Sequence, residues 1–176
     1  MKLNRIAIAL LCVFAIACQN NAPLKYKTYR SDSLHFSLKA PEDWQTEEKL
    51  QGQKTFALTE SPKDSLKEYK GNLVIWLEEL PIPVADSVYA QAAVTQIKIS
   101  NAQLNISPLT QILRGNKHYF HFQFDFSTVD SMHYAVEGYT LLHQLHAYNM
   151  IFTCEKTKSA TYKPILDTIL NSFTAL

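Results

Sequence analysis

Apolar and polar residues alternate most regularly in the second half of the chain. Every second position from residue 120 to residue 126 is phenylalanine. The positions between them are His121, Gln123 and Asp125. Because successive side chains of a strand point to opposite faces, this pattern predicts a strand with one aromatic face and one polar face. Residues 134–142 and 146–154 predict two more strands, so we expect an antiparallel sheet whose apolar face must be covered.

Two segments have the spacing of amphipathic helices. The clearer one ends the chain, where apolar side chains recur at intervals of three and four. These side chains are Tyr162, Ile165, Leu166, Ile169, Leu170 and Phe173. Thr161 is its expected N-cap, with Pro164 in the first turn, and Asp86 is the expected N-cap of a weaker helix over residues 84–100. We expect the terminal helix to cover the phenylalanine row, and the 84–100 helix or solvent to cover the polar row.

Other segments complete the expected sheet. Residues 34–38 alternate in polarity and predict a half-buried strand, whereas residues 72–80 are apolar on both faces, as in a central strand. Residues 105–114 form a weaker strand that Pro108 interrupts, which indicates an edge. Turns are expected at Gly115-Asn116 and Gln144-Leu145. The pattern therefore predicts the α+β class, with an antiparallel β-sheet flanked by helices.

The first 17 residues have the pattern of a signal peptide. Lys2 and Arg5 precede an apolar run over residues 6–16, which is too short to span a bilayer. The run ends Ala15-Ile16-Ala17-Cys18, which resembles the lipobox of bacterial lipoproteins, although leucine is usual where Ala15 stands. An ordinary secretory peptide cleaved after Ala17 is the alternative.

The lipobox resemblance implies cleavage before Cys18, followed by acylation of its sulfur and its new amino group. Several acyl chains would anchor the protein stably. Residues 18–25 would form a short lipidated tether, and residues 26–176 a single globular domain. In lipoproteins of Gram-negative bacteria, an aspartate directly after the acylated cysteine resembles an inner-membrane retention signal. This chain has Gln19 at that position, so we expect an outer-membrane lipoprotein that faces the periplasm.

Charge and motifs exclude several classes of function. Without Lys2 and Arg5 the chain has 15 basic and 16 acidic residues, and it contains no basic run. Nucleic-acid binding requires a cationic surface and is therefore not expected. The four glycines are too far apart for a nucleotide-binding loop, and G-x-S-x-G, H-E-x-x-H and C-x-x-C motifs are all absent. We expect no enzyme, no cofactor and no metal.

A few side chains remain as candidates for chemistry. Cys154, the last thiol after processing, is expected to be a buried hydrophobe rather than a nucleophile. His143 and His146 flank the predicted turn and could be cross-strand neighbours, but two nitrogens alone are a poor metal site. His118 and His121 should lie on opposite faces of their strand.

The polar row and the phenylalanine row each allow two interpretations. His121, Gln123 and Asp125, with Glu137 opposite, form either an acid–base site or a solvated or helix-covered sheet face, and the second is favoured. The phenylalanine row is either core or a ligand groove, and core is favoured.

The beginning of the domain resembles that of the PsbP-like superfamily. The residues that carry this resemblance are Tyr29, Leu34-His35-Phe36-Ser37-Leu38, Pro41 and Trp44. The segment Ile169-Leu170-Asn171-Ser172-Phe173 is similar to the closing helix of that group. The resemblance implies an α/β/α sandwich, with an antiparallel sheet between helices and usually without catalysis. No functional residue of the family maps onto this chain.

These observations lead to two expectations about function. The first is a lipid-anchored, non-catalytic envelope protein that binds an envelope protein partner near the outer membrane. The alternative is a periplasmic carrier of a small apolar ligand held between the sheet and a helix.

Overall fold

The computed structural model describes residues 23–61, 71–129 and 131–176. Its strands are β1 (Tyr26–Ser31), β2 (Phe36–Pro41), β3 (Gln45–Lys49), β4 (Thr55–Thr59), β5 (Asn72–Glu79), β6 (Thr110–Arg114), β7 (Lys117–Ser127), β8 (His133–His143), β9 (His146–Glu155) and β10 (Thr174–Ala175). Its helices are α1 (Asp86–Ser100) and α2 (Ser159–Ser172), with a short 3₁₀ turn at Lys156–Lys158. The predicted signal peptide and Cys18 lie outside the described residues.

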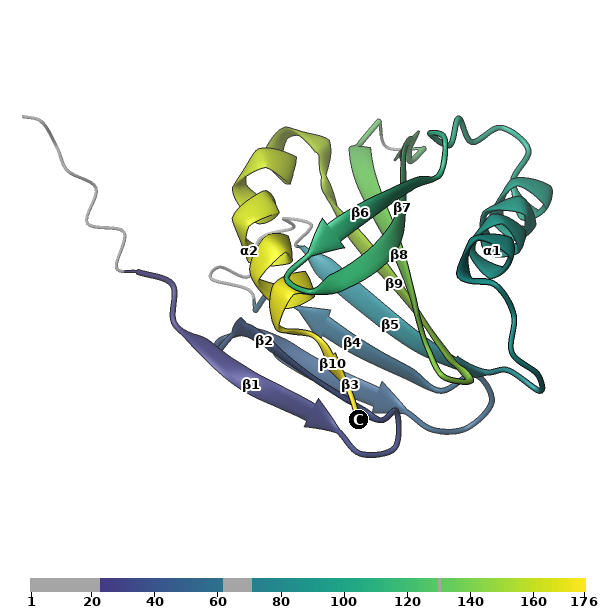
Figure 1. Cartoon of the computed structure of the whole chain (residues 1–176). Helices are drawn as coiled ribbons and strands as arrows, with labels where there is room; N and C mark the ends of the chain where they lie inside the picture. Colours follow the sequence, from purple (N-terminus) through teal and green to yellow (C-terminus); the bar gives the residue numbers. More distant parts are fainter. Residues whose placement is uncertain (1–22, 62–70, 130) are drawn as a thin grey trace, which may run out of the picture.

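Seven strands form one antiparallel sheet in the order β3-β4-β5-β9-β8-β7-β6, and β1, β2 and β10 form a smaller sheet. The two helices lie on opposite sides of the large sheet (Figure 1). This arrangement confirms the predicted α+β class. The small sheet is an addition that the sequence pattern did not predict.

The main core fills the space between the large sheet, the small sheet and α2. The apolar stripe of α2 faces this core, as predicted. Its buried members are Tyr162, Leu166, Ile169 and Leu170. They meet buried side chains of β2, including Phe36 and Leu38, and of β9. The Tyr119 hydroxyl donates a 2.9 Å hydrogen bond to the Leu170 carbonyl and so joins β7 to α2.

The opposite face of the large sheet has a much smaller core. Only Ala90 and Val94 of α1 are buried. Val94 packs with Ile106 and Phe122, and a few half-buried side chains surround them. Since α1 contributes so little apolar surface, it covers this face only in part.

Several predicted positions are confirmed. β5 lies inside the sheet between β4 and β9, as its apolar pattern predicted, and β6 is an edge strand. β6 and β7 are paired around Gly115, and β8 and β9 around the turn at Gln144. Gly115 has a φ of 60°, in the left-handed region that glycine adopts without a steric penalty.

The prediction that the terminal helix, α2, covers the phenylalanine row is wrong. On β7, Tyr119 and His121 lie on the face of α2, where His121 stacks against Tyr139. The phenylalanines therefore face α1, and Phe122 is the buried member of the second core. Both faces of β7 carry aromatic side chains, so alternation alone did not show which face the stronger helix would cover.

Both predicted N-caps are also wrong. α1 begins at Asp86 itself, after Ala85, and no side chain caps it. α2 begins at Ser159, directly after the 3₁₀ turn, so Thr161 and Pro164 both lie inside the helix. No helix in the described ranges is long and apolar enough to cross a lipid bilayer.

Phe122 can lie flat on the sheet because its cross-strand neighbour is Gly138. A β-carbon at position 138 would overlap the Phe122 ring. The backbone at Gly138 is not in the left-handed region, so the restriction is one of space.

We predict that Gly138→Ala lowers the free energy of unfolding by about 1–3 kcal/mol, because the Phe122 ring must move out of its place. Urea unfolding measures this loss. In a Phe122→Leu background the same substitution should cost clearly less, since the smaller side chain leaves room. An equal cost in both backgrounds would contradict the explanation.

Candidate functional site

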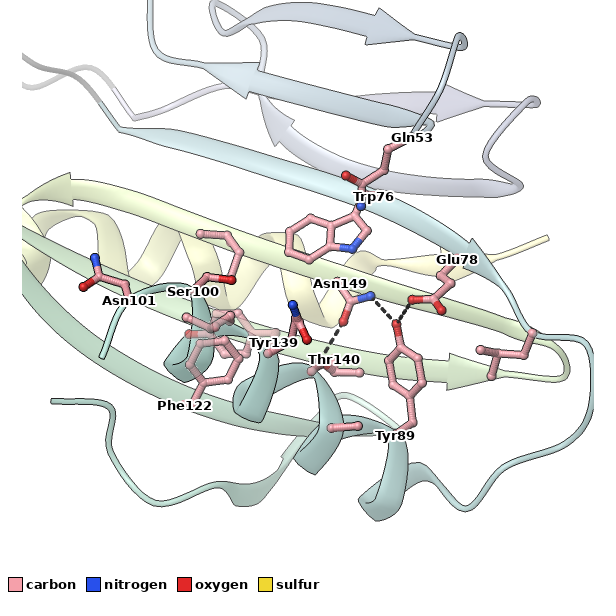
Figure 2. A pocket seen from close by; sticks show the side chains of 16 residues that line it. Gln53, Trp76, Glu78, Tyr89, Ser100, Asn101, Phe122, Tyr139, Thr140 and Asn149 are labelled. Atoms are coloured by element: carbon pink, nitrogen blue, oxygen red, sulfur yellow. Dashed lines mark hydrogen bonds between the residues drawn. The ribbon is translucent and has the colours of Figure 1, made fainter. Parts of the chain in front are cut away.

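A pocket of about 670 Å³ lies between α1 and the large sheet (Figure 2). Its apolar lining includes Trp76, Leu80, Ile97, Phe122 and Ile151. Its size is that of a site for a small molecule, and such sites are usually apolar with a few polar groups that orient the ligand. The incomplete cover that α1 gives to this face therefore leaves a space suited to a ligand.

Strand register arranges the floor of the pocket in levels. At one level Trp76 of β5, Asn149 of β9 and Thr140 of β8 are direct cross-strand neighbours. Two residues further along β9 lies Ile151, whose partner Gly138 lies beside Phe122. In the opposite direction along the sheet, Glu78 lies two residues after Trp76 on the same face of β5. The floor thus changes from apolar at Phe122 to acidic at Glu78.

A chain of hydrogen bonds crosses the polar end of the pocket (Figure 2). Thr140 donates to Asn149 Oδ1 at 3.0 Å, and Asn149 Nδ2 donates to the Tyr89 hydroxyl at 2.8 Å. The Tyr89 hydroxyl donates to Glu78 Oε2 at 2.6 Å. Thr140 and Asn149 are only 2% and 3% exposed. Such buried polar groups require partners, and Tyr89 supplies one of them from α1.

The phenol of Tyr89 stays protonated. Partial burial raises the pKa of Tyr89 well above its ordinary value, and the hydrogen bond to Glu78 raises it further. Tyr89 therefore remains a hydrogen-bond donor to Glu78 at physiological pH.

The polar row of β7 lies away from this pocket, on the face of α2. His121 bonds to Glu137, as the acid–base hypothesis required, and Tyr139 donates to the same carboxylate at 3.3 Å. Gln123 is exposed, and Asp125 pairs with Lys156 on the surface. The row is therefore half covered at His121 and solvated beyond it, and α1 does not cover it.

Cys154 is buried, as predicted, and lines a small cavity of about 150 Å³ beside Glu137 and Tyr139. Burial, together with Glu137 and Glu155, raises the pKa of Cys154 to about 11. A neutral thiol is a poor nucleophile, so this environment does not support a catalytic cysteine.

His143 and His146 are cross-strand neighbours, as expected. His146 stacks on His35, with ring centroids 5.4 Å apart. Within the described ranges, no group of three or more metal-ligating side chains is positioned to hold an ion.

Sequence reasoning missed the polar residues of the pocket. Asn149 gave the one usable signal, because it is a polar residue inside an otherwise apolar strand. Its partners lie on β8 and α1, and only the register and the place of α1 bring them together.

No family model and no curated protein matches the chain. Solved structures do match. Cyanobacterial PsbP (CyanoP) from Synechocystis sp. PCC 6803 superposes with a TM-score of 0.61 at 12% identity, over 91% of this chain and 98% of that one. LpqN of Mycobacterium tuberculosis, described as involved in cell envelope biogenesis, gives 0.61 at 13% identity, over 88% and 86%.

A protein of Bacteroides thetaiotaomicron VPI-5482 matches with a TM-score of 0.58 at 19% identity, over 85% of this chain. The match spans only 48% of that longer protein. At these identities the similarities establish architecture rather than activity. The chain has the PsbP-like fold that its opening residues and closing helix predicted.

Proposed function

We propose that the chain is a non-catalytic binding protein of the cell envelope, and that the pocket beneath α1 receives a small, largely apolar ligand. The composition of this pocket carries the proposal. It combines a space of about 670 Å³ with aromatic and aliphatic walls and one convergent polar group. The polar side chains of that group are hydrogen-bonded to one another rather than arranged as nucleophile and base, which favours binding over catalysis.

The proposed location is the outer membrane, with the domain facing the periplasm and held by acylated Cys18. The support is the signal-peptide pattern, the lipobox-like sequence and Gln19. A tether over residues 18–25 reaches some 20–25 Å at about 3.3 Å per residue, so the domain would stay near the membrane surface. The fold shared with LpqN, which is described as involved in cell envelope biogenesis, agrees with this location.

A protein partner is the second candidate for what the chain binds. The observation that favours it is the outward side of α1, where Val88 is 61% and Ile99 71% exposed. Eleven residues are about three helical turns, so the two side chains point to the same side. Together they make this side of α1 the candidate contact surface.

The pocket proposal predicts a molecule that accompanies the purified chain and depends on the space beneath α1. Ala93 lines the pocket, so Ala93→Phe should fill it and exclude the molecule. Thr95→Phe adds the same ring on the exposed side of α1 and serves as the matched control. Mass spectrometry of organic extracts should detect the molecule with the wild type and with Thr95→Phe, but not with Ala93→Phe. Identical extracts from all three would count against a ligand in this pocket.

The anchor proposal predicts that Cys18 carries the acyl chains. Cells labelled with radioactive palmitate should incorporate label into the wild-type chain and lose it in Cys18→Ser. Cys154→Ser is the matched control, because that thiol is buried and should not be acylated. Label that persists in Cys18→Ser would refute the anchor.

The partner proposal predicts that charge on the outward side of α1 weakens an envelope interaction. After cross-linking in intact cells, the Val88→Glu, Ile99→Glu double variant should recover several-fold less of a specific partner than the wild type. Leu113→Glu, at an exposed position on the edge strand β6, should recover the wild-type amount. Equal recovery from all three proteins would exclude this surface as the contact.

A further inference from the structure

The hydrogen bonds of the pocket all run in one direction. Thr140 donates to Asn149, Asn149 donates to Tyr89, and Tyr89 donates to Glu78. This series of hydrogen bonds ends at the carboxylate of Glu78. An ionised carboxylate accepts hydrogen bonds and cannot donate them. Tyr89 uses one carboxylate oxygen, Oε2. The other oxygen lies at the exposed rim of the pocket, where it can accept a hydrogen bond from water or from a donor on a ligand.

The charge of the lining points the same way. Among the described residues that line the pocket, Glu78 is the only charged one, and none is basic. Glu78 lies at the exposed rim of the pocket. An anionic headgroup would find a like charge here and no cation to balance it, whereas a cationic headgroup would find an opposite charge.

Trp76 adds a second attraction for a cation. It lies two residues before Glu78, on the same face of β5, and its indole ring borders the pocket beside Asn149 (Figure 2). The face of an indole ring attracts ammonium groups, and tryptophan is the best of the aromatic residues for this contact. An aromatic ring and a carboxylate thus lie together at one end.

The floor of the pocket is apolar at the other end, where Ser100 and Asn101 from the end of α1 contribute the polar part of the lining (Figure 2). Ile151 pairs with Val74 of β5, four residues before Glu78, and its other neighbour Gly138 lies beside Phe122. At about 3.3 Å per strand residue, this apolar level lies roughly 13 Å from the level of Glu78. A ligand that fills the pocket would have its charged group at one end and an apolar body at the other.

We propose that the pocket selects amphiphilic molecules that end in a protonated amine, with the ammonium group at Glu78 and Trp76 and the apolar body directed toward Phe122 and Ile151. This inference rests on the proposed function of the same pocket and specifies its ligand class. Glu78 is the residue that sets the preference for charge.

The test compares three probes with the same six-carbon chain and different headgroups: hexylammonium, hexanol and hexanoate. The full lipoprotein in lipid nanodiscs is titrated with each by isothermal calorimetry, and empty nanodiscs give the background. Hexylammonium should bind about tenfold more tightly than hexanoate, with hexanol between them. Equal or tighter binding of hexanoate would overturn the ligand class.

Two variants test whether Glu78 is the residue that causes the preference for the ammonium headgroup. Glu78→Gln should weaken hexylammonium binding several-fold and leave hexanol binding unchanged, since the contact of the ammonium group with Trp76 remains. Glu79→Gln removes the same charge from the next residue, which is exposed and paired with Lys54, and should retain the wild-type preference. An undiminished preference in Glu78→Gln, or a preference lost in Glu79→Gln, would refute the role of Glu78.

The same titrations separate this inference from the proposed function. If hexanol binds but hexylammonium shows no advantage, the pocket binds apolar molecules and the amine preference is wrong. If no probe binds above the empty nanodiscs, while thermal unfolding shows that the protein is folded, both ligand binding in the pocket and the amine preference are wrong.

Discussion

The large sheet has two apolar faces, but the described part of the chain provides only one strongly amphipathic helix. α2 buries four side chains and, with the small sheet, covers most of one face. α1 buries only Ala90 and Val94, so the second face cannot be closed by the packing of this helix. Helices in proteins owe most of their stability to the packing of an apolar face. The architecture therefore leaves α1 weakly packed and leaves a space beneath it.

A buried amide helps to explain why α1 lies where it does. Asn149 sits in the middle of an apolar strand, and leaving it without a partner would cost about 1–3 kcal/mol. Thr140 satisfies its oxygen from the neighbouring strand, and Tyr89 satisfies its nitrogen from α1. Hydrogen bonds thus supplement the small apolar contact of α1, and the tyrosine side chain holds the start of this helix at a distance from the sheet.

Alternation along the chain was enough to predict much of the fold. It identified β5 as an internal strand, β6 as an edge, and the hairpins that turn at Gly115 and Gln144, because each depends on local side-chain pattern. Turn chemistry supports the first hairpin through Gly115, whereas Gln144 has a φ of 56° that its residue type does not favour. The alternation did not show which of the two faces of β7 would lie against α2. β7 has phenylalanines on one face and Tyr119 on the other, and the choice between them depends on where α2 lies, 40 residues further along the chain.

The pocket was even less accessible to sequence reasoning. A carrier with its ligand between sheet and helix was the alternative expectation, but its residues were not identified. Glu78 lay within the predicted central strand over residues 72–80, and Tyr89 within the weaker predicted helix over residues 84–100. Their relation to Asn149 exists only because β9 lies between β5 and β8 and because α1 crosses above them. Long-range register, rather than local pattern, creates the site.

The difference between the fold and the site also explains why similar solved structures establish the fold of this chain but not its ligand. Proteins with 12% and 13% identity share the arrangement of strands and helices, since a sheet needs only apolar side chains at the right periodicity. Ligand selectivity requires particular groups at a particular level of the sheet. In the proposed site those groups are Trp76 and Glu78, at the end of one strand and under the start of a helix that the core holds only weakly. A protein could therefore keep this fold and bind a different ligand if the residues at these two positions changed.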